Sequence, residues 1–494
     1  MVLEIFFGEF IYFIRINPLT ILIQSDFVVC MNNLLNPKKS LWGPLHFYKR
    51  ALLIALPVMG QLLIQNMVSL IDNFMVAGLG DVKMSGVNIA GQINFIFLVF
   101  INAICISGGI FISQYNGAKN SQGMQQAYRF KLIIGLIAGC IYTCICVFFP
   151  RPFLSLMVHG NAASEEIIAE GVRYMRMLAP SWLPAVIATT TGTSLREMGK
   201  VKPPLLISVT ATCVNTFFNW VLIYGNLGAP RLETSGAAIA TIIARVTEMT
   251  IFLLFLKKVR PPFIFKVINF FQVNWKLFLS ILRKSGLILI SEMSWVLSET
   301  ITTALYNSRG GAEVVSGMAA GFAIANLFFV CFNGIGTATG VILGGTLGAN
   351  KLDEARVQKT WLMSGSFIFG FFGTLVGCLA VLIVPVVFGN LSASAQSVTR
   401  GLVLLNAAYM PTWVFINAQF AVSRTGGDAV LGAKVDLFVN CLIVVPGMFL
   451  LTKFTAMGPV ALYGVIKLTD AAKIIGCAIG LKKERWVRNL TIQE

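Results

Sequence analysis

The chain has 494 residues, of which 56% are hydrophobic and only 12% are charged. This composition is too apolar for an ordinary soluble protein and indicates a helical protein that crosses the membrane many times. The formal net charge of +17 does not indicate nucleic-acid binding, because the basic residues occupy short loops between apolar runs rather than one face of a soluble domain.

The first 40 residues are apolar but interrupted by charged and polar side chains. No basic segment precedes their apolar part and no small-residue cleavage site follows, so they do not match a signal peptide. We interpret residues 1–45 as an N-terminal extension and lead-in, poorly ordered in part, with Met31 as an alternative start.

Twelve apolar runs follow, each long enough to cross a hydrocarbon core of roughly 30 Å. They cover residues 51–77, 87–113, 128–150, 170–193, 203–224, 235–256, 278–306, 315–344, 359–387, 400–422, 430–452 and 458–480. Loops rich in Lys and Arg alternate with loops that contain few, which places both termini in the cytoplasm. Nine of the ten cysteines fall inside these runs and no Cys/His spacing suits zinc, so we expect neither disulfides nor a metal centre.

An internal repeat with an offset of 231 positions organises these runs. Ser85-Gly86 returns as Ser316-Gly317, and Gly117-Ala118 returns as Gly348-Ala349. Each copy contains six runs, so both copies enter the membrane in the same direction, as parallel repeats do. The repeat predicts an N-terminal lobe (46–256), a cytoplasmic linker (257–277), a C-terminal lobe (278–480) and a cytoplasmic tail (481–494). Two similar lobes with a seam between them suit a transporter that works by alternating access.

Polar residues in the first span lie on one helical face. Gln61, Gln65, Ser69 and Asp72 are spaced four, four and three positions apart. An ionisable group at membrane depth is costly, so Asp72 is a functional candidate. The alternative is that Asp72 caps the outer end of the helix, but the helix dipole disfavours an acidic group near a C-terminus.

Span 7 carries two carboxylates, Glu292 and Glu299, which are seven positions apart and share a face. The offset of 231 matches Glu292 with Gln61. Carboxylates in a low-dielectric cavity suit reversible proton binding, and with amide and hydroxyl oxygens beside them they suit sodium equally well. For Glu299 the alternative is a position near the interface or a hydrogen bond between helices.

The last span of each lobe carries a basic residue three positions before an acidic one. These pairs are Arg245 with Glu248 and Lys467 with Asp470, and each can pair within one helix and so offset its desolvation. The alternative is that the pairs line the cavity and exchange partners during transport. In span 5, Asn215 and Asn219 lie one turn apart, either as a polar site or as hydrogen bonds that join helices.

Four segments, taken in order, resemble the multidrug and toxic compound extrusion (MATE) family. They are Pro57 with Ile71 to Gly80, Ser113 to Ala118, Asn215 to Gly225, and Gly236 to Thr241. The resemblance covers residues 46 to 480. It implies an all-α polytopic membrane protein with twelve transmembrane helices in two pseudo-symmetric six-helix lobes that form a V. It also implies export of substrates against a proton or sodium gradient.

The resemblance also implies roles for single residues. Asp72 matches the family's first-helix aspartate, which takes part in cation binding, and Asn215 matches a fifth-helix asparagine of that site. Asn219 stands where some members carry an aspartate, and Glu292 is similar to a seventh-helix glutamate. The tenth-helix aspartate of some sodium-coupled members has no counterpart, which leaves the coupling ion open.

We therefore expect a secondary active antiporter that exports amphipathic or cationic drug-like molecules. The expected cation-coupling residues are Asp72, Asn215, Asn219 and Glu292, with sodium, if it is the ion, at the first three. The expected cavity residues are Gln61, Gln65, Ser69, Thr241, Arg245, Glu248, Glu299, Lys467 and Asp470. We expect a monomer in the cell membrane, with no cofactor beyond the coupling proton or sodium ion.

Two other functions stay open. A flippase of lipid-linked saccharides shares this fold superfamily, and a cavity rich in Arg and Lys would favour it. Lys467 and Arg245 are the only deep cations that the sequence indicates, so the flippase ranks second. A membrane enzyme is less well supported, because no Ser/His, HExxH or paired-carboxylate arrangement stands out. No P-loop sequence is present either, so direct ATP drive is not expected.

Overall fold

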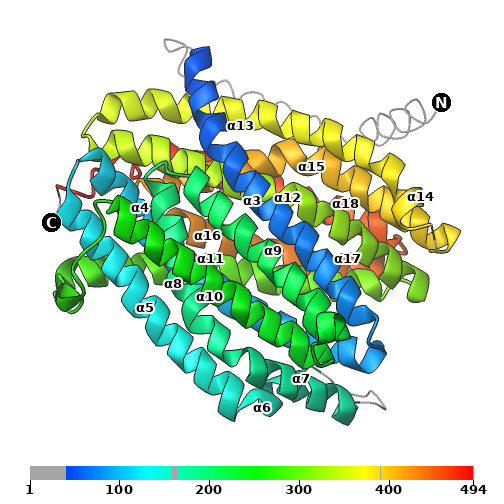
Figure 1. The fold of residues 1–494 in the computed structure, drawn as a ribbon. Coiled ribbons are helices and arrows are strands. Elements are labelled where there is room, and N and C mark those ends of the chain that lie inside the picture. Colours follow the sequence, from blue (N-terminus) through cyan, green and yellow to red (C-terminus); the bar gives the residue numbers. More distant parts are fainter. Residues whose placement is uncertain (1–40, 158–163, 390, 493–494) are drawn as a thin grey trace.

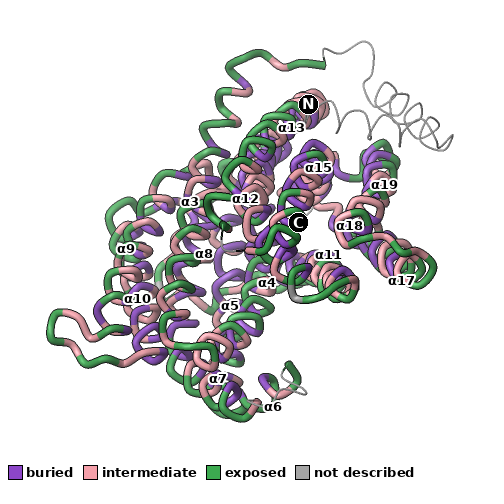
Figure 2. Tube along the Cα trace, turned by 90° about the vertical axis from the view of Figure 1, so that its right-hand side faces the viewer, coloured by how far each residue is buried: buried purple, intermediate pink, exposed green. Residues whose placement is uncertain are grey.

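The fold is a bundle of long helices (Figure 1). The computed structural model describes residues 41–157, 164–389 and 391–492, and these residues contain helices and no strands. The predicted extension before residue 41 lies outside the described residues. Large apolar side chains such as Phe148, Val386 and Phe454 are exposed, where they would contact lipid. Figure 2 shows exposed residues along the outer faces of the helices.

The first half of the chain forms six spans. Its elements are α3 (Leu45–Ala77), α4 (Asp81–Gly117), α5 (Ser121–Phe148), α6 (Pro150–Ser155), α7 (Ser164–Leu178), η1 (Ala179–Ser181), α8 (Trp182–Glu197), α9 (Lys202–Tyr224), η2 (Asn226–Gly228) and α10 (Glu233–Val259). The fourth span is assembled from α7, η1 and α8. Pro180 lies at the start of η1, and because proline has no backbone N–H it interrupts the helical ladder there.

The second half repeats this order after the short element η3 (Val267–Asn269). Its elements are α11 (Trp275–Asn307), α12 (Ala312–Gly348), α13 (Leu352–Ala380), η4 (Val381–Ile383), α14 (Val384–Val387), α15 (Ala393–Thr425), α16 (Ala429–Val439), η5 (Asn440–Val444), α17 (Val445–Phe454), α18 (Pro459–Lys467) and α19 (Asp470–Lys482). The eleventh span joins α16, a π-helical turn and α17, and Pro446 in the first turn of α17 removes a backbone donor at the join.

Nine helices of the described segments are long and apolar enough to cross a membrane. The other three spans are α7 with α8, α11, and α18 with α19. The twelfth span is broken at Leu468 and Thr469, where the Thr469 hydroxyl donates to the Ile466 carbonyl at 2.6 Å and so competes with the backbone ladder. The expected all-helical fold with twelve transmembrane helices in two lobes is confirmed.

The two lobes are in close register. The bounds of α4 and α12 differ by 231 positions at both ends, as the repeat predicts, whereas those of α3 and α11 differ by 230. The one-residue difference places Ser291, and not Glu292, opposite Gln61. The predicted equivalence of Glu292 and Gln61 is therefore wrong, because the connection between α11 and α12 is one residue longer than the connection between α3 and α4.

The first helix of each lobe packs into the core of the other lobe along its first half. Ile54 and Met59 of α3 belong to the hydrophobic cluster of the C-terminal lobe, whereas Phe278 and Ile288 of α11 belong to that of the N-terminal lobe. The lobes meet where α12 contacts α3 and α4, and where α4 contacts α11. The second half of α3, which carries Asp72, contacts α9 of its own lobe, so this helix links the seam to the interior of the lobe.

Candidate functional site

A polar cluster in the N-terminal lobe lies between α3, α9 and α10. The Asn219 amide donates to Asp72 Oδ1 at 2.8 Å and to Asn215 Oδ1 at 3.4 Å, and Asn215 Nδ2 donates to Thr241 Oγ1 at 3.4 Å. The structure therefore brings together four of the residues that the sequence singles out. We call Asp72, Asn215, Asn219 and Thr241 the outer cluster.

Two features of the outer cluster suit a small cation. Asn219 Oδ1 is buried and has no hydrogen-bond partner among the described residues, although a buried acceptor ordinarily has one. Within the same residues Asp72 accepts a hydrogen bond from Asn219 and pairs with no basic side chain. A carboxylate, two amide oxygens and a hydroxyl are hard oxygen ligands, so the site can hold a proton on Asp72 or a sodium ion between these oxygens.

A second chain of hydrogen bonds lies deeper in the same lobe. Gln61 Nε2 donates to Ser208 Oγ at 2.9 Å, and Ser208 donates in turn to Glu248 Oε1 at 2.8 Å. Arg245 pairs with the other oxygen of Glu248 at 2.8 Å, which confirms the predicted pairing within one helix. Gln65 and Ser69 make no side-chain hydrogen bond to the described residues. On the polar face of α3, only Gln61 and Asp72 are hydrogen-bonded to other helices among these residues.

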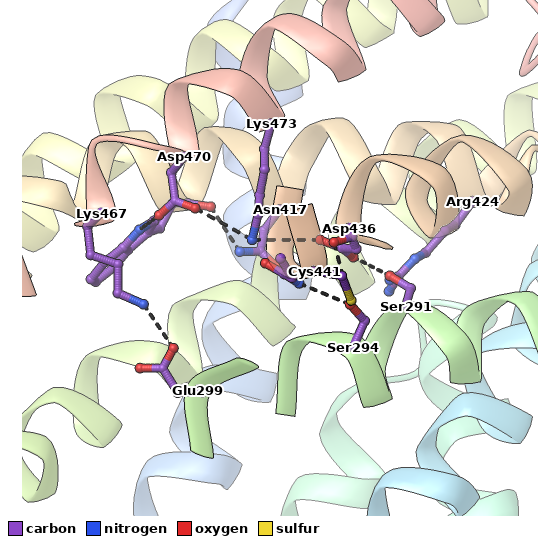
Figure 3. Close-up of polar contacts among 12 residues, drawn as sticks. Ser291, Ser294, Glu299, Asn417, Arg424, Asp436, Cys441, Lys467, Asp470 and Lys473 are labelled. Carbon is purple, nitrogen blue, oxygen red and sulfur yellow. Dashed lines mark hydrogen bonds and ion pairs between the residues drawn. The ribbon is translucent and has the colours of Figure 1, made fainter. Parts of the chain in front are cut away.

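The C-terminal lobe holds a larger cluster between α11, α15, α16 and α19 (Figure 3). The Ser291 hydroxyl donates to Asp436, and the Lys473 ammonium lies 3.7 Å from Asp436 Oδ1 and 3.5 Å from Asp470 Oδ1. The Trp413 indole donates to the other oxygen of Asp470 at 2.8 Å. Lys473 is therefore the shared counter-ion of two buried carboxylates.

Both glutamates of α11 are ion-paired with another helix. Glu292 Oε1 lies 2.9 Å from Arg424 Nη1. Glu299 Oε2 lies 2.9 Å from Lys467 Nζ (Figure 3). The predicted pairing of Lys467 with Asp470 is wrong. The helix is interrupted between the two residues, so Lys467 turns toward α11 while Asp470 turns toward Lys473.

Six members of these networks were not among the predicted site residues. They are Ser208, Ser291, Trp413, Arg424, Asp436 and Lys473. The expectation that Lys467 and Arg245 are the deep cations is also wrong, because Lys473 and Arg424 are largely buried and Lys131 is fully buried against two hydroxyls. Asp436 could have been found, since it is a carboxylate inside a predicted span. Arg424 could not, because its position at the end of α15 places it among the loop cations that set topology.

The two lobes build their polar sites from equivalent helices. In each lobe the first, fifth and sixth spans contribute, through Gln61, Ser208 and Glu248 in one and Ser291, Asp436 and Asp470 in the other. The charges differ, however. Each acid of the C-terminal cluster has a Lys or Arg beside it, and Glu248 of the N-terminal lobe likewise pairs with Arg245. Asp72 instead accepts a hydrogen bond from the Asn219 amide and has no basic partner among the described residues.

Charged side chains held between helices of a two-lobed bundle define a polytopic membrane transporter. The profile of the MatE family matches residues 57–221 and 288–450, one segment in each lobe. The chain belongs to this family, the MATE transporters, and it is a transporter rather than an enzyme. The resemblance noted in the sequence is thereby confirmed.

Related proteins are similar to this one along most of its length. The probable multidrug resistance protein NorM of Oceanobacillus iheyensis is 22% identical over 427 residues, covering 83% of this chain and 91% of the relative. The multidrug resistance protein NorM of Vibrio cholerae is 24% identical over 333 residues, covering 65% and 70%.

Solved structures share the fold. A crystal structure of MATE in complex with MaL6 superposes with a TM-score of 0.79 at 18% identity, covering 90% of this chain and 97% of that one. An outward-facing multidrug resistance MATE family transporter gives a TM-score of 0.76 at 20% identity, covering 90% and 96%.

Proposed function

We propose that this chain is a secondary active multidrug antiporter, which exports amphipathic or cationic small molecules in exchange for protons or sodium ions by alternating access. Relatives similar along most of its length are named multidrug resistance proteins. The substrates are drug-like molecules that reach the seam between the lobes from the bilayer or the cytoplasm.

The observation that carries the proposal is the environment of Asp72. Its carboxylate is half-buried, is held by the Asn219 amide and lacks a basic partner among the described residues. An isolated carboxylate at membrane depth is stable only if it acquires a positive charge, and a proton or a sodium ion supplies that charge. Asp72, Asn215 and Asn219 are therefore the coupling residues, with Thr241 as the fourth oxygen donor.

Helix α3 connects this site to the lobe seam. Its second half meets α9 through the bond between Asp72 and Asn219, and its first half packs into the core of the opposite lobe. Pro57 lies inside the helix and removes one hydrogen bond from its ladder. Binding of a cation at Asp72 changes its bond to Asn219, and α3 then repacks against the seam and favours release of the substrate outside.

Glu292 and Glu299 have a different proposed role from Asp72. Because each is already paired with a cation from another helix, neither is free to take up a coupling ion without breaking its ion pair. We place both in the second lobe as groups that exchange partners when the lobes move. Gln61, Gln65, Ser69, Arg245, Glu248, Lys467 and Asp470 stay candidate cavity residues.

The positive-inside rule gives the orientation of the proposed transporter. Loops that follow α4, α8, α10, α12 and α15 carry the basic residues and face the cytoplasm, as do both termini. The lobes correspond to residues 46–256 and 278–480, joined by the cytoplasmic linker 257–277, and the protein acts as a monomer.

A flippase of lipid-linked saccharides is the second candidate, and it would need an excess of positive charge facing the pyrophosphate. Arg245, Arg424, Lys467 and Lys473 are each paired with at least one carboxylate. The charged clusters therefore present no net basic surface, and the antiporter is the better-supported function.

Transport by the purified protein in liposomes tests the proposal and identifies the ion. Ethidium efflux is measured while a pH gradient and a sodium gradient are imposed separately. We expect one of the two gradients to drive efflux. If neither gradient moves ethidium, while labelled lipid-linked saccharide crosses the bilayer in the same liposomes, the antiporter is wrong and the flippase is right.

A further inference from the structure

The residues that follow α19 cross the end of the bundle at which α4, α12 and α15 finish. The chain turns at Glu484, which adopts a left-handed conformation with φ of 51°, and Trp486 is then buried with 2% of its surface exposed. The Trp486 indole donates to the Leu481 carbonyl at 3.2 Å. We call residues 484–491 the C-terminal strap, and it lies at the same end of the bundle as the C-terminus in Figure 1.

Gln114 of α4 is the point at which the strap meets the N-terminal lobe. Its side chain is fully buried, and its amide nitrogen donates to the Thr425 carbonyl at 2.8 Å and to the Arg488 carbonyl at 3.3 Å. Its amide oxygen accepts from the Leu490 N–H at 2.8 Å. One side chain of the N-terminal lobe thus bonds both to α15 of the other lobe and to the strap.

One glycine lets the strap approach the C-terminal lobe, and a second lets the two lobes approach each other beside the strap. A Cβ on Gly426 would lie 1.7 Å from the Trp486 carbonyl oxygen, and a Cβ on Gly348 would lie 1.8 Å from the Gln114 carbonyl oxygen. The Asn489 amide donates to the Gly348 carbonyl at 3.3 Å, which satisfies a carbonyl at the end of α12. The strap therefore bonds to both α4 and α12 at the place where these helices of opposite lobes touch.

The strap is anchored in both lobes. Arg356 of α13 pairs with Glu484 through Nη2 at 2.8 Å, and Trp486 belongs to the hydrophobic cluster of the C-terminal lobe. Leu490, four residues further on, belongs to the hydrophobic cluster of the N-terminal lobe. A segment with one end in each core resists separation of the two lobes at this end.

We propose that the C-terminal strap is an intramolecular clamp, which stabilises the state in which the lobes meet at this end, with Gln114 as its receptor. The inference rests on the alternating-access mechanism proposed above. Opening at this end requires that Gln114 lose its bonds to Thr425, Arg488 and Leu490. The strap therefore sets the balance between the two states of the transporter, independently of which ion occupies Asp72.

Spin–spin distances across the seam test the clamp in the full-length protein. Labels are attached at Gln122→Cys and Ala349→Cys, two surface positions of opposite lobes, in a variant whose native cysteines are replaced. Gln114→Leu keeps the side-chain size and removes all three hydrogen bonds. We expect it to raise the population with the longer distance about tenfold, the size of effect that one or two buried hydrogen bonds give.

Gln419→Leu is the matched control, because Gln419 is also fully buried and donates to Ile474 within the same lobe. Asn489→Ala, which removes the bond to Gly348, serves as a second clamp variant. If Gln114→Leu and Asn489→Ala give the same distance distribution as the labelled protein without these substitutions, the clamp is wrong. If the wild-type protein itself never populates the longer distance with either gradient imposed, alternating access fails, and that result differs from failure of the clamp.

Discussion

At the scale of single residues, Lys473 decides whether two buried carboxylates can coexist. Its ammonium lies within 4 Å of both Asp436 and Asp470, and its side chain is 10% exposed. Removing one partner of a buried ion pair leaves an uncompensated charge and costs about 3–5 kcal/mol. We expect Lys473→Met to lower the free energy of unfolding by about that amount, read as a fall in the melting temperature of the purified protein.

The double variant Lys473→Met with Asp436→Asn should recover part of this loss, because it leaves one carboxylate instead of two. Arg151→Met provides the comparison. Arg151 pairs with Glu165 at 2.7 Å, but both side chains are mostly exposed, so its loss should cost less than about 1 kcal/mol. Equal melting temperatures for Lys473→Met and Arg151→Met would show that Lys473 does not neutralise the buried pair.

Sequence reasoning at the residue scale found the candidates but not their partners. The shared site of Asp72, Asn215 and Asn219 could be predicted, because helical spacing and the family resemblance both indicated the same faces of spans 1 and 5. The partner of Lys467 could not be predicted, since it depends on a helix break at Leu468 and Thr469, where the sequence has neither proline nor glycine.

At the scale of helices, the contact between α4 and α12 depends on the glycine at position 348. A Cβ on Gly348 would collide with the backbone of α4, whereas a Cβ on Gly345, one turn earlier on the same helix, meets nothing within 4 Å. We expect Gly348→Ala to force the helices apart and to reduce ethidium efflux, because the lobes can no longer close at this end. Gly345→Ala should transport at the wild-type rate, and an equal effect of both changes would contradict this account.

Helix positions were more predictable than helix continuity. The repeat and the apolar runs located all twelve spans, because both follow from the thickness of the membrane and the apolar composition. The breaks within spans 4, 11 and 12 were not predicted. They arise where a proline or a threonine hydroxyl disturbs the backbone ladder, as at Pro180, Pro446 and Thr469, and neighbouring helices then accommodate the break.

At the scale of the whole molecule, the two lobes are pseudo-symmetric in fold but differ in the charged residues of their polar sites. Equivalent helices build a polar site in each lobe, and both sites contain ion pairs, but the N-terminal lobe also holds Asp72, a carboxylate with no basic partner among the described residues. In the proposed mechanism the coupling ion therefore binds in the N-terminal lobe. Because α3 runs from that site into the core of the opposite lobe, a single binding event can alter the seam between them.

In the proposed mechanism Asp72 couples substrate movement to an ion gradient, and Asp72→Asn separates coupling from passage of the substrate. The amide cannot take up a proton or carry a charge for sodium, yet it keeps the size and the bonding of the site. In liposomes we predict that Asp72→Asn loses ethidium accumulation driven by a gradient but still exchanges labelled for unlabelled ethidium across the membrane. Accumulation by Asp72→Asn at the wild-type level would contradict the account.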